Sequence, residues 1–271
     1  MAFKITLDPG HGKFGNPAKV DGEWIVKDFY EGTNNFEACT YFKEYIEKKY
    51  KDVEVTLTRK NIDDDPNLEA RGAMGREADL FYSWHSNGVD TKAARGVSSF
   101  SSVRRDGKKL CTAIAEAVVA VFKECGSRNT YNRGYSQRKD EDYADVDWYG
   151  VLRSATLLNP TPVLYGAKPI DSKCKNAIII EHGFHSNPEE CAVLANPVYL
   201  KKIVEAEVKA IAVYFGLKEK DPSPEPPAPD DYYYYVVVSA NKNKKYAEED
   251  LAKVKKANKG FPEAYIKYAK R

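Results

Sequence analysis

The stretch Phe3-Lys4-Ile5-Thr6-Leu7-Asp8-Pro9-Gly10-His11-Gly12 joins a short apolar run to a glycine-rich turn that carries a histidine. The run over residues 3–7 has the length and apolar content of a buried strand. Four further runs of this kind follow along the chain. The expected strands are Phe3–Leu7, Val53–Thr58, Leu80–His85, Gly96–Ser102 and Ala177–Glu181.

The segments between these strands have the periodicity of helices. Apolar side chains at positions 36, 39, 42, 45 and 46, for example, fall on one helical face. Strands that alternate with helices favour an α/β fold, a mostly parallel twisted sheet with helices on both faces. Ligands bind such sheets beyond the carboxyl ends of the strands. The expected helices are Asn34–Lys49, Leu68–Ala78, Lys109–Cys125 and Pro197–Phe215, whereas the irregular stretch Gly126–Asn176 is expected to form surface loops and one helix at most.

The composition is that of a folded protein. Of the 271 residues, 42% are hydrophobic and 30% are charged, and the net charge is only +2, which argues against global disorder. The longest apolar runs, 177–180 and 211–215, are far shorter than the ~20 residues of a membrane-spanning helix. The first eight residues lack the pattern of a secretory signal. We therefore expect a protein made in a cytoplasm without a signal peptide, with no membrane insertion and with five reduced cysteines.

A proline-rich segment divides the chain. Residues 218–231 contain five prolines in fourteen positions, which is typical of a semi-rigid spacer. We therefore expect a body over 1–217, a linker over 218–231 and a tail over 232–271. The tail carries ten Lys/Arg and four Asp/Glu, whereas the remainder carries 32 basic and 36 acidic residues. An acidic body disfavours a nucleic-acid binder.

All four histidines lie at or just beyond the end of an expected strand. They are His11, His85, His182 and His185. Since parallel strands end at one edge of a sheet, several imidazoles and a carboxylate can meet there, which is the ligand set of a hydrolytic zinc site with one position left for water. From position alone, unrelated core or surface histidines are an equal alternative. A phosphate-binding loop over residues 10–15 is disfavoured, because the Gly-Lys-Ser/Thr signature is missing.

Five segments, in this order along the chain, resemble the zinc-dependent N-acetylmuramoyl-L-alanine amidases of the amidase-3 family. They are DPGHG (8–12), EGTNN (31–35), LTR (57–59), ADLFYSWHSN (78–87) and IIIEHGFHSN (178–187). The resemblance implies a zinc-dependent hydrolase with an α/β fold, whose substrate is bacterial peptidoglycan. The implied reaction is cleavage of the amide between N-acetylmuramic acid and L-alanine.

The family's site residues carry over position by position. The resemblance implies that His11, Glu31 and His85 bind Zn²⁺ and that Glu181 is the catalytic acid/base. Glu181 follows an apolar run, so burial would raise its pKa. His182 and His185 depart from the family's E-x-G-F-x-S-N motif, and either could approach the metal in place of His85.

Two further features of the body have a structural and a functional interpretation. Arg71 matches an arginine of the family, and a structural salt bridge is expected for it rather than catalysis. The stretch Thr156–Asn176 is longer than the family's usual connection at this place. It either shapes the substrate groove or forms an inert loop.

The tail resembles one half of a SPOR-type peptidoglycan-binding domain. A strand, a helix and a strand are expected over Tyr232–Ser239, Tyr246–Asn258 and Glu263–Tyr268. That family contains two such units and this chain contains one, so we expect two tails to pair and form a homodimer. The alternative is a basic appendage that is held to anionic wall polymers by charge alone.

These features together favour a phage endolysin, made in the bacterial cytoplasm without a signal peptide and acting on the cell wall after release, at host lysis. The sequence does not separate it from a prophage-derived or host autolysin. A zinc peptidase that cuts within the stem peptide is the alternative enzyme. A wall-binding adaptor without catalysis is the alternative outside enzymes.

Overall fold

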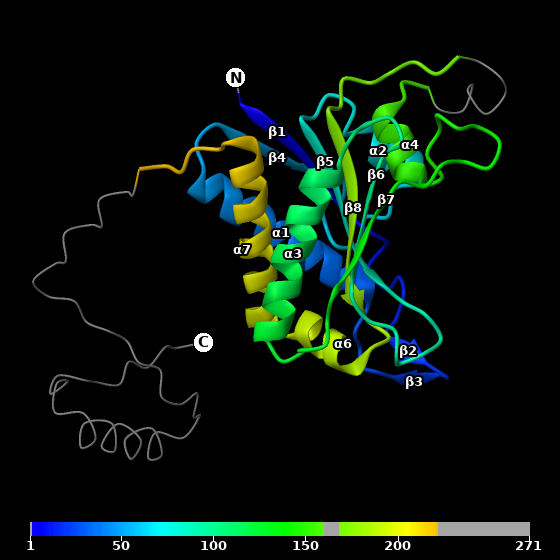
Figure 1. The fold of residues 1–271 in the computed structure, drawn as a ribbon, viewed down its shortest axis with the longest axis vertical. Coiled ribbons are helices and arrows are strands. Elements are labelled where there is room, and N and C mark those ends of the chain that lie inside the picture. The colour runs from blue at the N-terminus through cyan, green and yellow to red at the C-terminus, as the bar shows by residue number, and fades with distance from the viewer. Residues whose placement is uncertain (1, 160–167, 222–271) are drawn as a thin grey trace, which may run out of the picture. The chain divides into compact units, whose positions relative to one another are not determined.

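A six-stranded sheet forms the centre of the body (Figure 1), in the strand order β4-β1-β5-β8-β6-β7. The computed structural model describes residues 2–159 and 168–221. A two-stranded ribbon, β2-β3, lies outside this sheet. In chain order the strands are β1 (Phe3–Pro9), β2 (Lys19–Val20), β3 (Glu23–Trp24), β4 (Val53–Leu57), β5 (Leu80–Asn87), β6 (Val97–Ser101), β7 (Asn132–Ser136) and β8 (Asn176–Phe184).

The four strands β4, β1, β5 and β8 are parallel to one another. β6 runs antiparallel to β8, and β7 is parallel to β6. The α/β class with a mostly parallel sheet is therefore confirmed. Because β1, β5 and β8 are parallel, their carboxyl ends meet at one edge of the sheet, and the glycine-rich turn after β1 lies at that edge.

Helices cover both faces of the sheet (Figure 1). Alternate strand residues pack into two separate cores: Trp84 and Ile180 face the larger one, whereas Phe81 and Ile179 face the smaller one. The helices α1 (Glu31–Lys49), α3 (Lys108–Glu124), α6 (Pro188–Ala195) and α7 (Pro197–Phe215) contribute to the larger core, α4 (Gly150–Thr156) contributes to the smaller core, and α2 (Leu68–Ala73) packs against α4.

Several elements differ from the sequence prediction. The strands β5 and β8 run two and three residues further than expected, through Asn87 and Phe184. The helix α2 ends five residues earlier than expected, at Ala73. The strand β7 forms within Gly126–Asn176, where only loops and one helix at most were expected, and α6 forms where no element was predicted. Asn187 caps its first turn by accepting bonds from the backbone N–H groups of Glu189 and Glu190.

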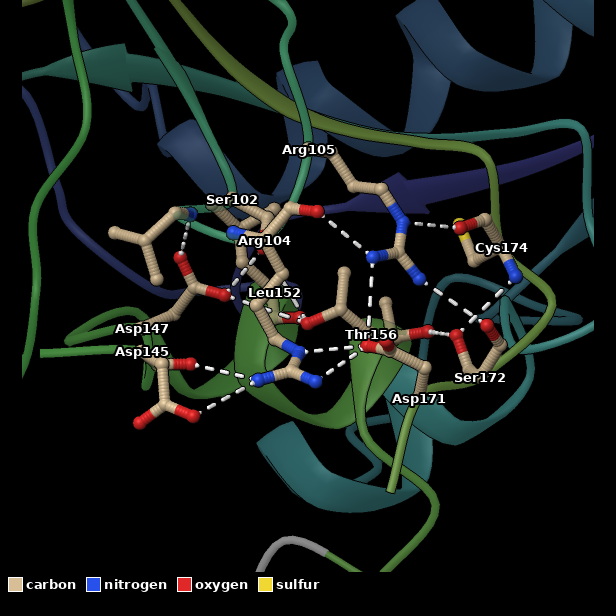
Figure 2. Close-up of polar contacts among 12 residues, drawn as sticks. Ser102, Arg104, Arg105, Asp145, Asp147, Leu152, Thr156, Asp171, Ser172 and Cys174 are labelled. Carbon is tan, nitrogen blue, oxygen red and sulfur yellow. Dashed lines mark hydrogen bonds and ion pairs between the residues drawn. The ribbon is translucent and has the colours of Figure 1, made fainter. Parts of the chain in front are cut away.

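The stretch Gly126–Asn176 is anchored to the sheet by a polar network (Figure 2). The buried carboxylate of Asp147 accepts bonds from Ser102 Oγ (2.6 Å) and from the backbone N–H of Val103 (2.7 Å). Arg104 pairs with Asp171 on the segment that leads into β8. This network lies at the amino end of β8, opposite to the edge where β1 and β5 end.

The body makes contacts beyond the expected boundary at residue 217. The backbone N–H of Lys51 donates to the carbonyl of Lys218, and that of Lys220 donates to the carbonyl of Lys49. The first three residues of the expected linker therefore pair with the end of α1. The expected tail elements lie outside the described residues. Within the described ranges, no helix combines the length and apolarity that crossing a membrane requires.

Candidate metal centre and active site

Three of the residues singled out in the sequence meet at the carboxyl edge of the sheet. His11 follows β1, Glu31 begins α1 and His85 lies near the end of β5. One ligand atom from each lies within 4.8 Å of the other two. Glu31 lies between the imidazoles, with Oε1 at 3.1 Å from His85 Nδ1 and Oε2 at 3.4 Å from His11 Nε2.

Two glycines near this cluster have neighbouring atoms so close to their Cα atoms that no side chain would fit. A Cβ atom on Gly10 would lie 2.1 Å from Cε1 of His85, and one on Gly32 would lie 1.7 Å from the carbonyl oxygen of Gly12. His11 itself has a φ of 62°, in the left-handed region that most residues avoid. The turn after β1 is therefore shaped to bring His11 over the start of α1 and to leave room for the His85 ring.

Glu31 is a carboxylate held in place by several donors. Only 1% of its surface is exposed. Asn16 Nδ2 donates to Oε2 (2.8 Å), while Asn35 Nδ2 (3.3 Å) and the backbone N–H of Ser86 (3.0 Å) donate to Oε1. Burial alone would raise the pKa of Glu31. The hydrogen bond and positive charge of His85, with the charge of His11, outweigh burial and hold its pKa at about 2.

The two histidines respond to this environment in opposite directions. Burial lowers the pKa of His11, and the charge of Glu31 only partly opposes this effect. Burial also acts to lower the pKa of His85, but the hydrogen bond to Glu31 outweighs it and the net pKa is raised. Glu31 is therefore the ionised group of the cluster, and an imidazole lies on each side of its carboxylate.

The donor set fits a divalent metal ion. His11 Nε2 lies 3.1 Å from Asn16 Nδ2, which can only donate, so Nε2 carries its lone pair. Two imidazole nitrogens and a carboxylate oxygen are the protein ligands found in hydrolytic zinc sites. The sequence analysis missed Asn16; the Gly-Asn-Pro sequence around it marks a turn but does not show what its side chain contacts.

Glu181 lies beside this cluster. It pairs with His85 in the register of β5 and β8 and with Ser98 in that of β8 and β6. The preceding residue on the same face of β8, Ile179, packs in the smaller core. Burial raises the pKa of Glu181 to about 7; the charge of His85 acts to lower it and that of Glu31 to raise it. A carboxyl group with this pKa both accepts and donates protons near neutral pH.

The other two histidines do not join the cluster. His182 follows Glu181 in β8 and points to the opposite face, because strand side chains alternate. It is fully buried and hydrogen-bonded to Glu207 of α7. His185 lies closer to the site, and its Nδ1 is 2.9 Å from Ser86 Oγ. Among residues 2–159 and 168–221, the candidate metal cluster contains His11, Glu31 and His85 alone.

Arg71 forms the expected salt bridge, and its partner is Asp8 of β1. Its Nε and Nη2 donate to the two carboxylate oxygens of Asp8 at 2.7 and 2.8 Å. Thr58 and Ser83 hydroxyls also donate to Asp8. Burial acts to raise the pKa of Asp8, but Arg71 and the hydroxyl donors outweigh it and the pKa is lowered. The buried carboxylate of Asp8 thus connects β1 with α2 through Arg71, with β5 through Ser83, and with the residue that follows β4, Thr58.

Comparison with known proteins identifies the family. Residues 5–213 match the family model Amidase_3, described as N-acetylmuramoyl-L-alanine amidase. The germination-specific N-acetylmuramoyl-L-alanine amidase of Bacillus subtilis (strain 168) is 25% identical over 239 residues, 82% of each chain.

Solved structures share the fold. The catalytic domain of the amidase CwlV from Bacillus (Paenibacillus) polymyxa var. colistinus has a TM-score of 0.54 at 20% identity, over 80% of this chain and 99% of that domain. The CwlD amidase from Clostridioides difficile, solved in complex with the GerS lipoprotein, has a TM-score of 0.55 at 22% identity, over 79% of this chain and 97% of that chain. Since the family model matches most of its length, this chain belongs to the Amidase_3 family of N-acetylmuramoyl-L-alanine amidases.

Proposed function

We propose that this chain is a zinc-dependent amidase that cleaves the bond between N-acetylmuramic acid and L-alanine in bacterial peptidoglycan. The observation that carries the proposal is the cluster of His11, Glu31 and His85 at the carboxyl edge of the sheet, with Glu181 opposite His85. Family membership supports the substrate class.

Three residues would hold the ion. His11 and His85 would supply imidazole nitrogens, and Glu31 would supply a carboxylate oxygen. When bound, Zn²⁺ would act as a Lewis acid on the amide carbonyl and would make a water molecule more acidic near neutral pH. The donors from Asn16, Asn35 and the Ser86 backbone would keep Glu31 ionised and oriented.

Glu181 would move the proton. As a carboxylate, it would take a proton from the attacking water while the oxygen of that water adds to the lactyl carbonyl carbon. It would then give the proton to the alanine nitrogen as the carbon–nitrogen bond breaks. The products are a free carboxylic acid on the muramic acid and a free amine on the peptide. A positioned acid/base of this kind contributes about 10²–10⁴-fold to the rate.

The experiment is a digest of purified peptidoglycan with mass spectrometry of the products. Wild type is compared with Glu181→Gln, each with added Zn²⁺ and with a chelator. We expect free L-alanine amines and intact glycan strands with zinc-loaded wild type alone. New amines at another position of the stem peptide would support the peptidase instead. Absence of product from zinc-loaded wild type would leave a wall-binding adaptor.

We also propose a lytic role as a phage endolysin. The body-linker-tail order of the sequence supports it, as do the cysteines, all five of which are free. The purified protein should clear suspensions of bacteria whose membrane has been permeabilised. Cleavage of purified peptidoglycan without clearing of such cells would contradict the lytic role and leave the amidase activity in place.

A further inference from the structure

A buried ionisable cluster lies behind the candidate metal centre, on the other face of the sheet. Glu207 of α7 is fully buried in the larger core. It accepts hydrogen bonds from Tyr82 Oη (2.8 Å) and Trp84 Nε1 (3.1 Å), and it also contacts His182 Nε2. No lysine or arginine within residues 2–159 and 168–221 pairs with it. The reaction proposed above makes no use of this carboxylate.

His182 is bonded at both ring nitrogens. Its Nδ1 lies 2.8 Å from the carbonyl oxygen of His85, which can only accept, so Nδ1 donates. Its Nε2 faces the Glu207 carboxylate. The ring is therefore held at one nitrogen by the backbone of β5 and at the other by the side chain of Glu207. The ring is stacked on Trp84, with centroids 3.7 Å apart and planes 13° from parallel.

The peptide group between His85 and Ser86 is consequently bonded on both sides. Its carbonyl oxygen accepts from His182 at the back of the sheet, and its N–H donates to Glu31 Oε1 at the front (3.0 Å). The same peptide follows the backbone of His85, whose Nδ1 is 3.1 Å from that oxygen of Glu31. One hydrogen-bonded chain therefore runs from Glu207 through His182 and this peptide to Glu31.

We propose that His182, oriented by Glu207, is a positioning residue for the metal centre. It fixes the plane of the His85–Ser86 peptide, and through that peptide it sets the orientation of two of the three candidate ligands. The inference rests on the proposed metal site. Partners that orient metal ligands contribute about 10–100-fold to metal affinity.

A purely structural role makes a different prediction. A buried ion pair is a weak source of stability, because removing two charges from water costs about as much as their attraction returns. Replacing both partners by uncharged groups is therefore compatible with a folded protein. If the pair only filled the core, any well-packed replacement would leave metal affinity unchanged.

The test compares two variants of the full chain that differ only in whether residue 182 can donate a hydrogen bond to the backbone carbonyl of His85. Both carry Glu207→Gln, so that no buried charge is left unpaired. One adds His182→Asn, whose amide nitrogen stands at the same distance from the backbone as Nδ1, and the other adds His182→Leu, which has no donor. Ile178→Val, on the same face of β8 and in the same core, is the control for packing.

Two quantities are measured on each variant. The first is the dissociation constant for Zn²⁺, by competition with a chromophoric chelator. The second is the exchange rate of the Ser86 amide proton, by NMR on the metal-free protein. The second does not depend on zinc. If wild type fails to bind zinc, the proposed metal centre is overturned, and the exchange rate still shows whether His182 fixes the His85–Ser86 peptide.

We expect the leucine variant to bind Zn²⁺ about 10–100-fold more weakly and to exchange the Ser86 amide at least ~10-fold faster. The asparagine variant should stay within about threefold of wild type in both. Ile178→Val should lower the denaturation midpoint and change neither. Equal values for the leucine and asparagine variants would overturn the proposal.

Glu207→Gln alone keeps the inference testable if the leucine variant does not fold. The glutamine amide can donate to Nε2, so a neutral His182 still donates from Nδ1 to His85. We expect zinc affinity and Ser86 exchange within about threefold of wild type. A loss of zinc affinity above about tenfold would show that the charge of the pair, and not the bond to His85, is what matters, and would overturn the proposal.

Discussion

His85 and Glu181 occupy paired positions on the neighbouring strands β5 and β8. The candidate ligand and the candidate acid/base are therefore set at a fixed spacing by sheet hydrogen bonds instead of by loops. Sites built on strands are held more tightly than sites on loops, because the backbone beneath them is bonded on both sides.

Glu181→Gln is expected to separate the chemical step from metal binding. Glu181 lies outside the three-residue metal cluster, so the variant should keep its zinc. The rate of amide cleavage should fall by about 10²–10⁴, because the proton of the attacking water has no acceptor. Turnover on a soluble muropeptide and zinc content by atomic spectroscopy test both parts. A variant that loses its zinc would place Glu181 among the ligands.

Gly10→Ala is expected to damage the metal centre through packing alone. The added Cβ would lie 2.1 Å from Cε1 of His85, so the ring has to move. We expect zinc affinity to fall by at least about tenfold. Gly150→Ala is the matched control, because the nearest neighbour of its Cβ is a flexible leucine side chain at 3.1 Å. Equal zinc affinity in the two variants would contradict the assignment of His85.

Asp8→Asn is expected to destabilise the body by about 3–5 kcal/mol, because it leaves the Arg71 guanidinium buried without its partner. The pH dependence follows from the lowered pKa of Asp8. The unfolded chain takes up the proton first, near pH 3.8, so the stabilisation is complete above that pH and is lost as the pH falls through the folded-state value. Urea denaturation at several pH values measures this. In the variant, the part of the acid sensitivity due to Asp8 should disappear.

Zinc is expected to raise the thermal stability of the chain. A ligand that binds only the folded state stabilises it by about 2.7 kcal/mol when its concentration is 100 times its dissociation constant. Calorimetry with Zn²⁺ and with a chelator should therefore give two different melting temperatures. In His11→Ala the two temperatures should coincide. Identical melting of wild type in both conditions would contradict a metal centre.

The expected tail, which lies beyond the described residues, gives a further prediction. A chain that ends at Asp221 should cleave soluble muropeptides at the wild-type rate, because the candidate site lies within residues 11–181. It should sediment with purified cell walls less than the full chain does.

The salt dependence of wall binding separates the two interpretations of the tail. Wall binding by the full chain that survives 1 M salt would favour a specific module, whereas wall binding lost at that salt would favour charge alone, since the Debye length falls to about 3 Å. Sedimentation velocity of the full chain tests the expected homodimer.

The parallel core of the fold was predictable because its strands are short apolar runs that end in polar motifs. Leu80–His85 shows both properties, and its last residue is a candidate ligand. The helix Pro197–Phe215 was predictable to the residue, because Asn196 and Pro197 mark its start and Gly216 its end. The antiparallel direction of β6 was not predictable, since the direction of a strand is set by its partners and not by its own residues.

The site was predictable for the residues that carry a motif. The residues that hydrogen-bond to those site residues were not predictable, because they come from distant parts of the chain. Asn16 reaches Glu31 from a turn, and Glu207 reaches His182 from a helix that begins after the last recognised motif. The orientation of His182 required the true length of β8: once the strand is known to continue through Phe184, alternation places His182 opposite to Glu181.

That alternation limits which insertions and deletions the gene can tolerate. One extra residue between Ile180 and Glu181 would exchange the two faces of β8, placing the carboxylate of Glu181 in the larger core and the His182 imidazole on the side of the candidate metal cluster. Two extra residues would restore the faces but shift the motif along its neighbour, His85. Length changes in this family should therefore accumulate in the connection before β8 and stop at the strand itself.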